Sequence, residues 1–263
     1  MKIIVLIKQV PDTTDVKIDP VTNTLKREGV AAVINPFDMY AIEEAIRTRE
    51  RLAEGEIVVV TMGPPQALEA LREAISMGCD SAVLVSDRKF AGSDTWATSY
   101  TLSQAIKKIG DYKIVFCGKQ ASDGDTAQVG PGVSMHLGLP QVTYVKKIEK
   151  IDALSAVVER MTEEGYDIIE TPIPVLFTVV KEINEPRLPS LKGKIKAKKA
   201  EIPVWTAKDL ECDNDKIGLD GSPTRVLKIF TPPPRGGGRI IEGDPSEKAK
   251  ELSGLLKKII IGA

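Results

Sequence analysis

Short apolar runs alternate with longer amphipathic stretches up to Pro140 of the chain. The runs are rich in β-branched residues, as is typical of strands buried on both faces of a parallel sheet. They cover residues 3–7, 57–61, 82–85 and 113–117. Between them apolar residues recur at helical spacing, after turns that hold proline, glycine or aspartate. This alternation predicts a doubly wound, parallel α/β sheet with right-handed connections.

The pattern changes after Pro140, where strand-like runs follow one another with no room for helices. These runs cover residues 142–149, 156–161, 167–170 and 175–180, and we expect them to be antiparallel additions to the sheet. Nearer the N-terminus, residues 16–33 contain an Asp19-Pro20 turn and predict a hairpin or an irregular excursion. Asn35 is then expected to cap the next helix, with Pro36 in its first turn.

The composition shifts beyond Pro186 toward lysine, proline and glycine. This region has too little periodic apolar content for a core of its own. The aspartate, proline, serine and glutamate at residues 244–247 predict the capped start of a short final helix. We therefore expect an α/β domain over residues 1–185 and an extended C-terminal arm over residues 186–263.

The chain of 263 residues carries 36 Lys and Arg against 37 Asp and Glu, a formal net charge of -1. This balance gives no long-range attraction to nucleic acid or to anionic lipid, and no apolar run reaches the ~20 residues of a membrane span. The first apolar run is too short for a signal peptide, so we expect a cytoplasmic protein. Cys79, Cys117 and Cys212 show no C-x-x-C spacing, and we interpret them as reduced packing residues rather than metal ligands.

Four turns fall where the carboxyl ends of parallel strands meet helix N-termini, the usual place for ligands in such sheets. They are residues 35–38, 62–64, 92–95 and 123–131. In the last of these, glycines allow close backbone approach, and Thr126 and Gln128 suit phosphate or ribose. Asp123 and Asp125 would repel phosphate, so they are expected to face ribose, cap a helix or hold a cation. An aspartate-rich helix cap without any ligand is the alternative interpretation.

Familiar catalytic motifs are absent from the sequence. Neither G-x-G-x-x-G nor the P-loop pattern occurs, which disfavours a standard dehydrogenase or NTPase. The one histidine, His136, has no G-x-S-x-G partner motif and is interpreted as a packed or surface residue. Leu188, Leu191 and the lysines of residues 192–199 either dock a partner or form a solvated loop, and the sequence pattern alone leaves both open.

Several separated motifs resemble the beta subunit of electron transfer flavoproteins. They lie, in the family's order, at residues 5–10, 35–37, 118–131, 158–175, 184–187 and 196–199, so the resemblance spans essentially the whole chain. It implies a Rossmann-like domain of the adenine-nucleotide alpha-hydrolase-like type. It also implies that the arm packs on an alpha subunit that carries its own FAD.

The resemblance also implies which residues bind a nucleotide. They are Leu6, Lys8, Asn35, Pro36, Phe37, Asp38, Met62, Gly63, Asp94 and Thr95, followed by Asp123, Gly124, Asp125, Thr126, Ala127, Gln128, Val129, Gly130, Pro131, Gly132, Val133 and Ser134. Among these, Asp94 and Thr95 are candidates to line an isoalloxazine ring. Leu191 matches the recognition-loop leucine that family members insert into partner dehydrogenases such as acyl-CoA dehydrogenases.

The family has two versions that differ in the bound nucleotide. Simple members hold structural AMP, whereas electron-bifurcating members hold a second FAD that NADH reduces. Residues 61–65, 90–95 and 123–131 resemble the bifurcating version. We therefore expect FAD here, with AMP as the alternative, NADH as electron donor, and ferredoxin or flavodoxin as low-potential acceptor. In either version the flavin supplies the redox chemistry, so no catalytic side chain is expected.

Overall fold

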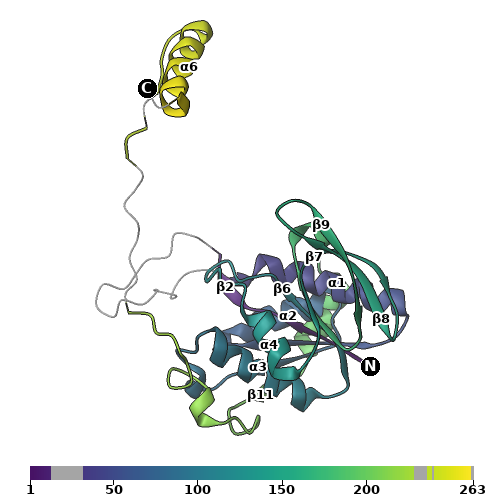
Figure 1. Ribbon diagram of the computed structural model, residues 1–263. Coiled ribbons are helices and arrows are strands. Elements are labelled where there is room, and N and C mark those ends of the chain that lie inside the picture. Colours follow the sequence, from purple (N-terminus) through teal and green to yellow (C-terminus); the bar gives the residue numbers. More distant parts are fainter. Residues whose placement is uncertain (13–31, 228–235, 239, 262–263) are drawn as a thin grey trace. The chain divides into compact units, whose positions relative to one another are not determined.

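The computed structural model describes residues 1–12, 32–227, 236–238 and 240–261 (Figure 1). Two compact units contain them, Met1–Leu227 and Lys228–Ala263. In the second unit, α6 (Pro245–Ile261) begins as predicted, because Asp244 Oδ1 accepts hydrogen bonds from the backbone N–H groups of Ser246 and Glu247. Among the described helices, none is long and apolar enough to cross a membrane.

The first unit is built on a sheet that, within the described residues, has nine strands in the order β11-β5-β4-β1-β6-β10-β7-β8-β9. Every pair from β11 to β7 is parallel, whereas β7–β8 and β8–β9 are antiparallel. The predicted α/β class, with a mainly parallel sheet and added antiparallel strands, is confirmed. The strands are β1 (Lys2–Leu6), β4 (Glu56–Met62), β5 (Ser81–Val85), β6 (Tyr112–Gly118), β7 (Gln141–Ile151), β8 (Ser155–Met161), β9 (Tyr166–Pro172), β10 (Val175–Val179) and β11 (Val204–Trp205).

One strand expectation is wrong. The run at residues 175–180 was expected to be antiparallel, but β10 lies between β6 and β7 and is parallel to both. All five of its residues are buried, and a continuous buried run is the pattern of a central parallel strand rather than of an alternating antiparallel one. The sequence does contain this signal, because residues 175–180 form a nearly continuous apolar run without alternating polar residues.

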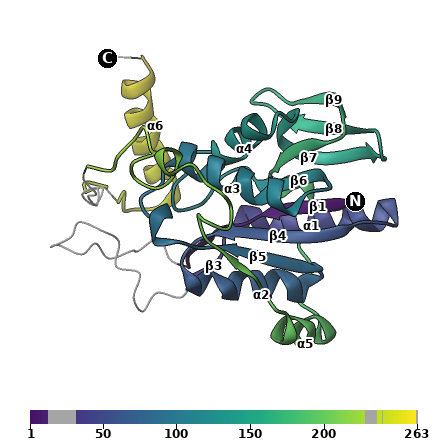
Figure 2. The same ribbon diagram turned by 90° about the horizontal axis from the view of Figure 1, so that it is seen from below.

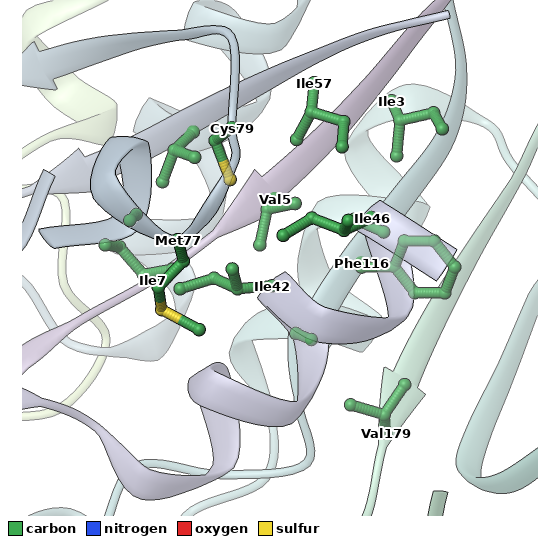
Figure 3. Packing of buried hydrophobic residues seen from close by; sticks show 14 of the residues in the cluster. Ile3, Val5, Ile7, Ile42, Ile46, Ile57, Met77, Cys79, Phe116 and Val179 are labelled. Carbon is green, nitrogen blue, oxygen red and sulfur yellow. The ribbon is translucent and has the colours of Figure 1, made fainter. Parts of the chain in front are cut away.

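Four helices cover the two faces of the sheet (Figure 2). Because side chains alternate along a strand, Ile3, Val5 and Ile7 pack with α1 and α2, as Figure 3 shows for α1, whereas Ile4 and Leu6 pack with α3 and α4. The helices are α1 (Pro36–Leu52), α2 (Leu68–Met77), α3 (Thr95–Ile109) and α4 (Val129–Leu137), and short 3₁₀ turns lie at η1 (Pro65–Ala67), η2 (Arg88–Phe90), η3 (Lys181–Ile183) and η4 (Asn214–Lys216). Such burial on both faces is what the β-branched runs predicted.

A small second sheet follows β1. It pairs β2 (Gln9–Pro11) with β3 (Ala32–Ile34) in antiparallel fashion. The predicted Asp19-Pro20 turn and most of the predicted excursion at residues 16–33 lie outside the described residues.

Residues 186–227 belong to the same compact unit as the sheet. The lysine-rich stretch is not a loop but a helix, α5 (Leu191–Lys199), which packs on α2. Arg72 Nη1 donates to the carbonyl of Ala197 over 2.6 Å, and Lys196 Nζ donates to that of Cys79 over 2.9 Å. Further along, β11 extends the parallel sheet beside β5. The change of composition near residue 185 therefore falls inside the compact unit, and contact of this segment with a partner subunit stays a prediction.

The cysteines fit the expected packing role. Cys79 and Cys117 are buried, and Cys212 is half-buried. Burial raises the pKa of the Cys79 thiol to about 12, so this side chain stays a neutral thiol.

Replacing Gly130 with alanine should destabilise the protein. A Cβ at this position would lie 2.8 Å from Cys117 Sγ and from Thr178 Cγ2, so α4 would have to move away from the sheet, and such overpacking costs about 1–3 kcal/mol. Thermal unfolding followed by circular dichroism measures the loss. Gly165→Ala is the control, because a Cβ there meets no atom within 4 Å. Equal midpoints for the two variants would contradict the close packing.

Candidate nucleotide-binding site

The sheet order reverses between β1 and β6. From β1 the chain proceeds to β4 and β5 on one side, and then crosses to β6 on the other side of β1. In open parallel sheets, ligands bind in the crevice beyond the carboxyl ends of the strands at such a reversal. The N-terminus of α1 and the loop after β6 lie at this place, since α1 contacts both β1 and β6.

Asp38 joins the ends of the two central strands. Its carboxylate accepts hydrogen bonds from the backbone N–H of Lys8, over 2.7 Å, and from that of Gly118, over 3.0 Å. Burial raises the pKa of this carboxyl to about 7, against the opposing effect of its hydrogen bonds and of the Lys8 charge. A Cβ on Gly118 would lie 2.5 Å from Asp38 Oδ1 and 2.6 Å from Phe37 Cβ. Only glycine at 118 therefore allows α1 to approach β6 this closely.

Asn35 holds the loop that follows β6. Its side-chain Nδ2 donates to the carbonyl of Gln120 over 2.8 Å, and its Oδ1 accepts from the backbone N–H of Ser122 over 3.0 Å. Asn35 is the N-cap residue of α1 by position, and Pro36 begins the helix as predicted, but the Asn35 side chain makes no capping hydrogen bond. The expected capping by this side chain is thus wrong, because the loop 85 positions further along the chain takes its hydrogen bonds.

Both acidic side chains of the 123–131 loop have partners. Lys8 Nζ lies 2.6 Å from Asp123 Oδ1, and Gln120 Nε2 donates a hydrogen bond to Asp125. The repulsion that these carboxylates would exert on a phosphate is therefore reduced, by charge pairing at Asp123 and by hydrogen bonding at Asp125. Asp125 and Ala127 have positive φ angles of 52° and 54°. Backbone that alternates between the two hands directs successive N–H groups to one side, which suits an anion.

The turn after β5 reaches the same loop. Thr95 Oγ1 donates to Gln128 Oε1 over 2.9 Å. Asp94 Oδ1 accepts from the backbone N–H groups of Trp96 and Ala97 and so caps α3, while its Oδ2 accepts from the N–H and hydroxyl of Thr224. Burial acts to raise the pKa of Asp94, but hydrogen bonds from Ala97, Thr224 and Trp96 outweigh it and lower the pKa. Asp94 thus stays ionised and is fixed by four hydrogen bonds.

The remaining predicted site residues divide between interior and edge. Met62 ends β4, and the N–H of Gly63, the next residue, donates to the carbonyl of Val85 over 3.0 Å. Several others pack inside the protein. Leu6 and Val133 are buried between the sheet and the helices α3 and α4, and Ser134 Oγ donates to the carbonyl of Leu139. Gly130 allows α4 to approach the sheet, and Gly132 allows it to approach α3. In contrast, a Cβ on Gly124 would meet no atom within 4 Å. Gly130 therefore serves close packing inside the protein, which differs from the ligand approach that the sequence suggested for it.

Sequence reasoning missed several residues that support this edge or line a cavity beside Pro131. Gln120 and Ser122 anchor the loop, and Thr224 fixes Asp94, through contacts between distant parts of the chain. Gln141 and Arg160 line a cavity of about 280 Å³ beside Pro131, and the atoms Gln141 Oε1 and Arg160 Nε have no hydrogen-bond partner among the described residues. No local sequence signal marks any of these five, because each depends on which strands become neighbours.

His136 lies against aromatic rings, as expected of a packed histidine. Its ring centroid is 4.8 Å from that of Trp96 and 5.7 Å from that of Tyr100. Trp96 itself is half exposed. Of the two alternatives that the sequence allowed, a packed or a surface histidine, these ring contacts favour the packed one.

The fold defines a doubly wound α/β protein, a class in which ligands bind at the reversal of strand order. The family described as "Electron transfer flavoprotein domain" matches residues 22–210. The electron transfer flavoprotein subunit beta of Thermoanaerobacterium thermosaccharolyticum is 54% identical over 253 residues, which cover 96% of each chain. The chain belongs to the electron transfer flavoprotein family, in its beta-subunit branch, and the predicted family is confirmed.

Two further relatives are not named as electron transfer flavoprotein subunit beta. Subunit CarD of the caffeyl-CoA reductase-Etf complex of Acetobacterium woodii is 48% identical over 259 residues, with 98% of each chain covered. Protein FixA of Azorhizobium caulinodans is 48% identical over 242 residues, 89% of this chain and 86% of its own. The similarity thus extends over nearly the full length of proteins that carry several functional names.

The stability of the wild-type protein relative to Asp38→Asn should fall as pH rises from about 4 through about 7. The pKa of this carboxyl is raised from 3.8 to about 7 in the folded state, so the folded state binds more protons over that interval. The free energy of unfolding contributed by Asp38 is then complete below the unfolded pKa and is lost as the folded group ionises. Urea unfolding of both proteins at several pH values measures it, and a difference that does not change with pH would contradict the raised pKa.

Proposed function

We propose that this chain is the beta subunit of a heterodimeric electron transfer flavoprotein and binds FAD at the edge between β1 and β6. The observation that carries this proposal is the anchoring of the 118–131 segment over the reversal of strand order by Asn35, Asp38 and Lys8. Three side chains from one end of the sheet hold one loop in place. A loop fixed before binding loses little conformational freedom when it closes on a ligand.

The residues present fit an adenine nucleotide. Carboxylate oxygens of Asp123 and Asp125 suit ribose hydroxyls, and Thr126 is exposed beside them. Backbone N–H groups near Ala127 and at the start of α4 suit a pyrophosphate. The open space around Gly124 leaves room for close approach of the ligand to the backbone.

FAD is favoured over AMP because two neighbouring turns are joined at the proposed site. The hydrogen bond between Thr95 and Gln128 links the turn after β5 to the loop after β6, which suits a ligand long enough to contact both. The sequences of residues 61–65, 90–95 and 123–131 also resemble those of bifurcating members. In this proposal the 123–131 loop holds the ADP half, and Asp94 and Thr95 line the isoalloxazine.

A flavin bound here supplies hydride acceptance from NADH and onward single-electron transfer to the alpha-subunit FAD and to a low-potential carrier such as ferredoxin or flavodoxin. The protein's own side chains bind and orient. Asp38 is shielded from solvent and is used for backbone hydrogen bonds, and Lys8 is paired with Asp123. Neither is placed to exchange protons with a substrate, so we assign no acid or base.

The proposed partners are an alpha subunit and a dehydrogenase acting on acyl-CoA-type substrates. The name of CarD places that relative in a complex with caffeyl-CoA reductase, which supports a partner of this class. Leu191, the proposed docking residue, is 77% exposed at the start of α5. A leucine this exposed is available for burial in a partner's pocket.

Cofactor content of the co-purified heterodimer tests the proposal directly. Denaturation, followed by chromatographic separation and counting of FAD and AMP, should yield two FAD per heterodimer and little AMP. One FAD and one AMP would instead make this chain a scaffold for structural AMP in a simple electron carrier. A complex with neither nucleotide in this subunit would contradict the assignment of the site.

Replacing Gly124 with valine should lower cofactor affinity and leave the fold intact. The new side chain enters open space in the protein but occupies the surface proposed for the ligand, so the expected loss is at least about tenfold in affinity, or roughly 1.4 kcal/mol. Equilibrium dialysis of the heterodimer against FAD gives the dissociation constant. Gly165→Val, also placed in open space, is the matched control at a distant turn. Unchanged nucleotide affinity in Gly124→Val would contradict the proposal that the 123–131 loop binds the nucleotide.

A further inference from the structure

Three exposed apolar side chains follow one another along the segment before and within α5. Leu188, Leu191 and Ile195 are 88%, 77% and 51% exposed. Leu191 and Ile195 are four residues apart in α5 and so lie on one side of that helix, whereas Leu188 lies in the chain just before it. We call this set the docking ridge. Exposed lysines at positions 192, 194 and 198 flank it. An apolar ridge with a basic surround matches a partner surface that has an apolar pocket and an acidic rim.

Arg187, the residue before the ridge, is bound to two glutamates of α1. Its Nε donates to Glu43 Oε2 over 2.8 Å and its Nη2 to Glu43 Oε1 over 3.1 Å. Its guanidinium also donates to both carboxylate oxygens of Glu50, over 2.8 and 3.2 Å. The backbone N–H of Arg187 adds a fifth hydrogen bond, to Glu43 Oε2 over 3.1 Å. Bidentate, charge-assisted pairs of this kind fix orientation as well as position.

The charges of these residues favour the contact of Arg187 with Glu43 and Glu50. Glu43 is 2% exposed. Burial acts to raise its pKa, but the hydrogen bonds from Arg187 and Arg47 outweigh it and lower the pKa. Glu43 therefore stays ionised, and the two arginines balance its charge. Arg47 Nε remains 2.7 Å from Glu43 Oε1, so loss of Arg187 alone does not leave a buried carboxylate without a cation.

Other contacts fix the chain on both sides of the ridge. Before it, Asn184 Nδ2 donates to the carbonyl of Tyr40 and to Glu44 Oε2. Within it, Ser190 Oγ caps α5 by accepting from the N–H of Gly193 over 3.0 Å, and after it Arg72 Nη1 donates to the carbonyl of Ala197. The ridge is thus presented by a short segment attached to α1 at one end and to α2 at the other.

We propose that Arg187 is a positioning residue for partner docking: it fastens the chain to α1 so that the docking ridge is ordered before the dehydrogenase arrives. The inference rests on the proposed function, in which Leu191 enters a pocket of that dehydrogenase. Ordering a segment on binding costs conformational entropy, and a ridge that is already ordered avoids this cost. Arg187 acts through the ridge and does not itself touch the cofactor edge described above.

The test uses the intact heterodimer and an acyl-CoA dehydrogenase that exchanges electrons with it. In Arg187→Gln, the KM for the dehydrogenase should rise about tenfold, kcat should change little, and amide exchange over residues 188–192 should become faster. NADH-driven reduction of a dye, which needs no docking, should be unchanged. Arg187→Lys should restore only part of the affinity, because lysine lacks the planar fork that holds both glutamates. Lys181→Gln is the control, since Lys181 is exposed and, among the residues that the structure describes, its ion pair is with the adjacent Glu182 at 4.0 Å.

A double-mutant cycle with Leu191→Ala separates the two proposals. If Arg187 acts through the ridge, its substitution should have a smaller effect on KM once Leu191 is truncated. An unchanged KM in Leu191→Ala would overturn the proposed docking role of the ridge. A raised KM in Leu191→Ala together with an unchanged KM in Arg187→Gln would overturn the positioning role alone. A loss of NADH-driven dye reduction equal to the loss of docking would also overturn it, because it would show general damage to the fold.

Discussion

The buried carboxylate of Asp38 is the interaction on which the geometry of the edge depends. It binds the N–H groups at the ends of β1 and β6, the two strands between which the sheet order reverses. Without it, two backbone donors at the end of the sheet would need other acceptors, and the N-terminus of α1 would lose its link to β6. Because Gly118 has no side chain, Phe37 and Asp38 approach the strand directly. The position of the 118–131 segment follows from this contact.

The same contact explains how an acidic loop suits an anionic ligand. Once α1 is seated, Asn35 reaches the backbone of residues 120–122, and Lys8 reaches Asp123. The carboxylates that would repel phosphate are then engaged by a cation and an amide of the protein itself. A charged loop that is unfavourable for phosphate in isolation becomes suitable through residues contributed by the start of the chain.

Local patterns predicted most elements, and long-range contacts account for what they did not predict. Periodicity gave the strands and helices up to Pro140, and the Asp244 cap needed only neighbouring residues. The parallel setting of β10 was missed although the sequence shows a nearly unbroken apolar run at residues 175–180, and all five β10 residues are buried. The side-chain partners of Asn35 and the structural role of Gly130 could not be predicted locally. Those depend on strand order, which a sequence pattern does not fix.

One helix connects the proposed cofactor edge to the proposed docking ridge. The first turn of α1 carries Asp38, and later turns carry Glu43 and Glu50, which bind Arg187 before the docking ridge. At 1.5 Å per residue, these groups lie along one rigid rod roughly 25 Å long, with its buried face set in the core beneath β1. A helix packed this tightly moves as a unit. The proposed cofactor edge and the proposed docking ridge therefore hold a fixed spacing, and electron transfer between two docked proteins needs such a spacing to be reproducible.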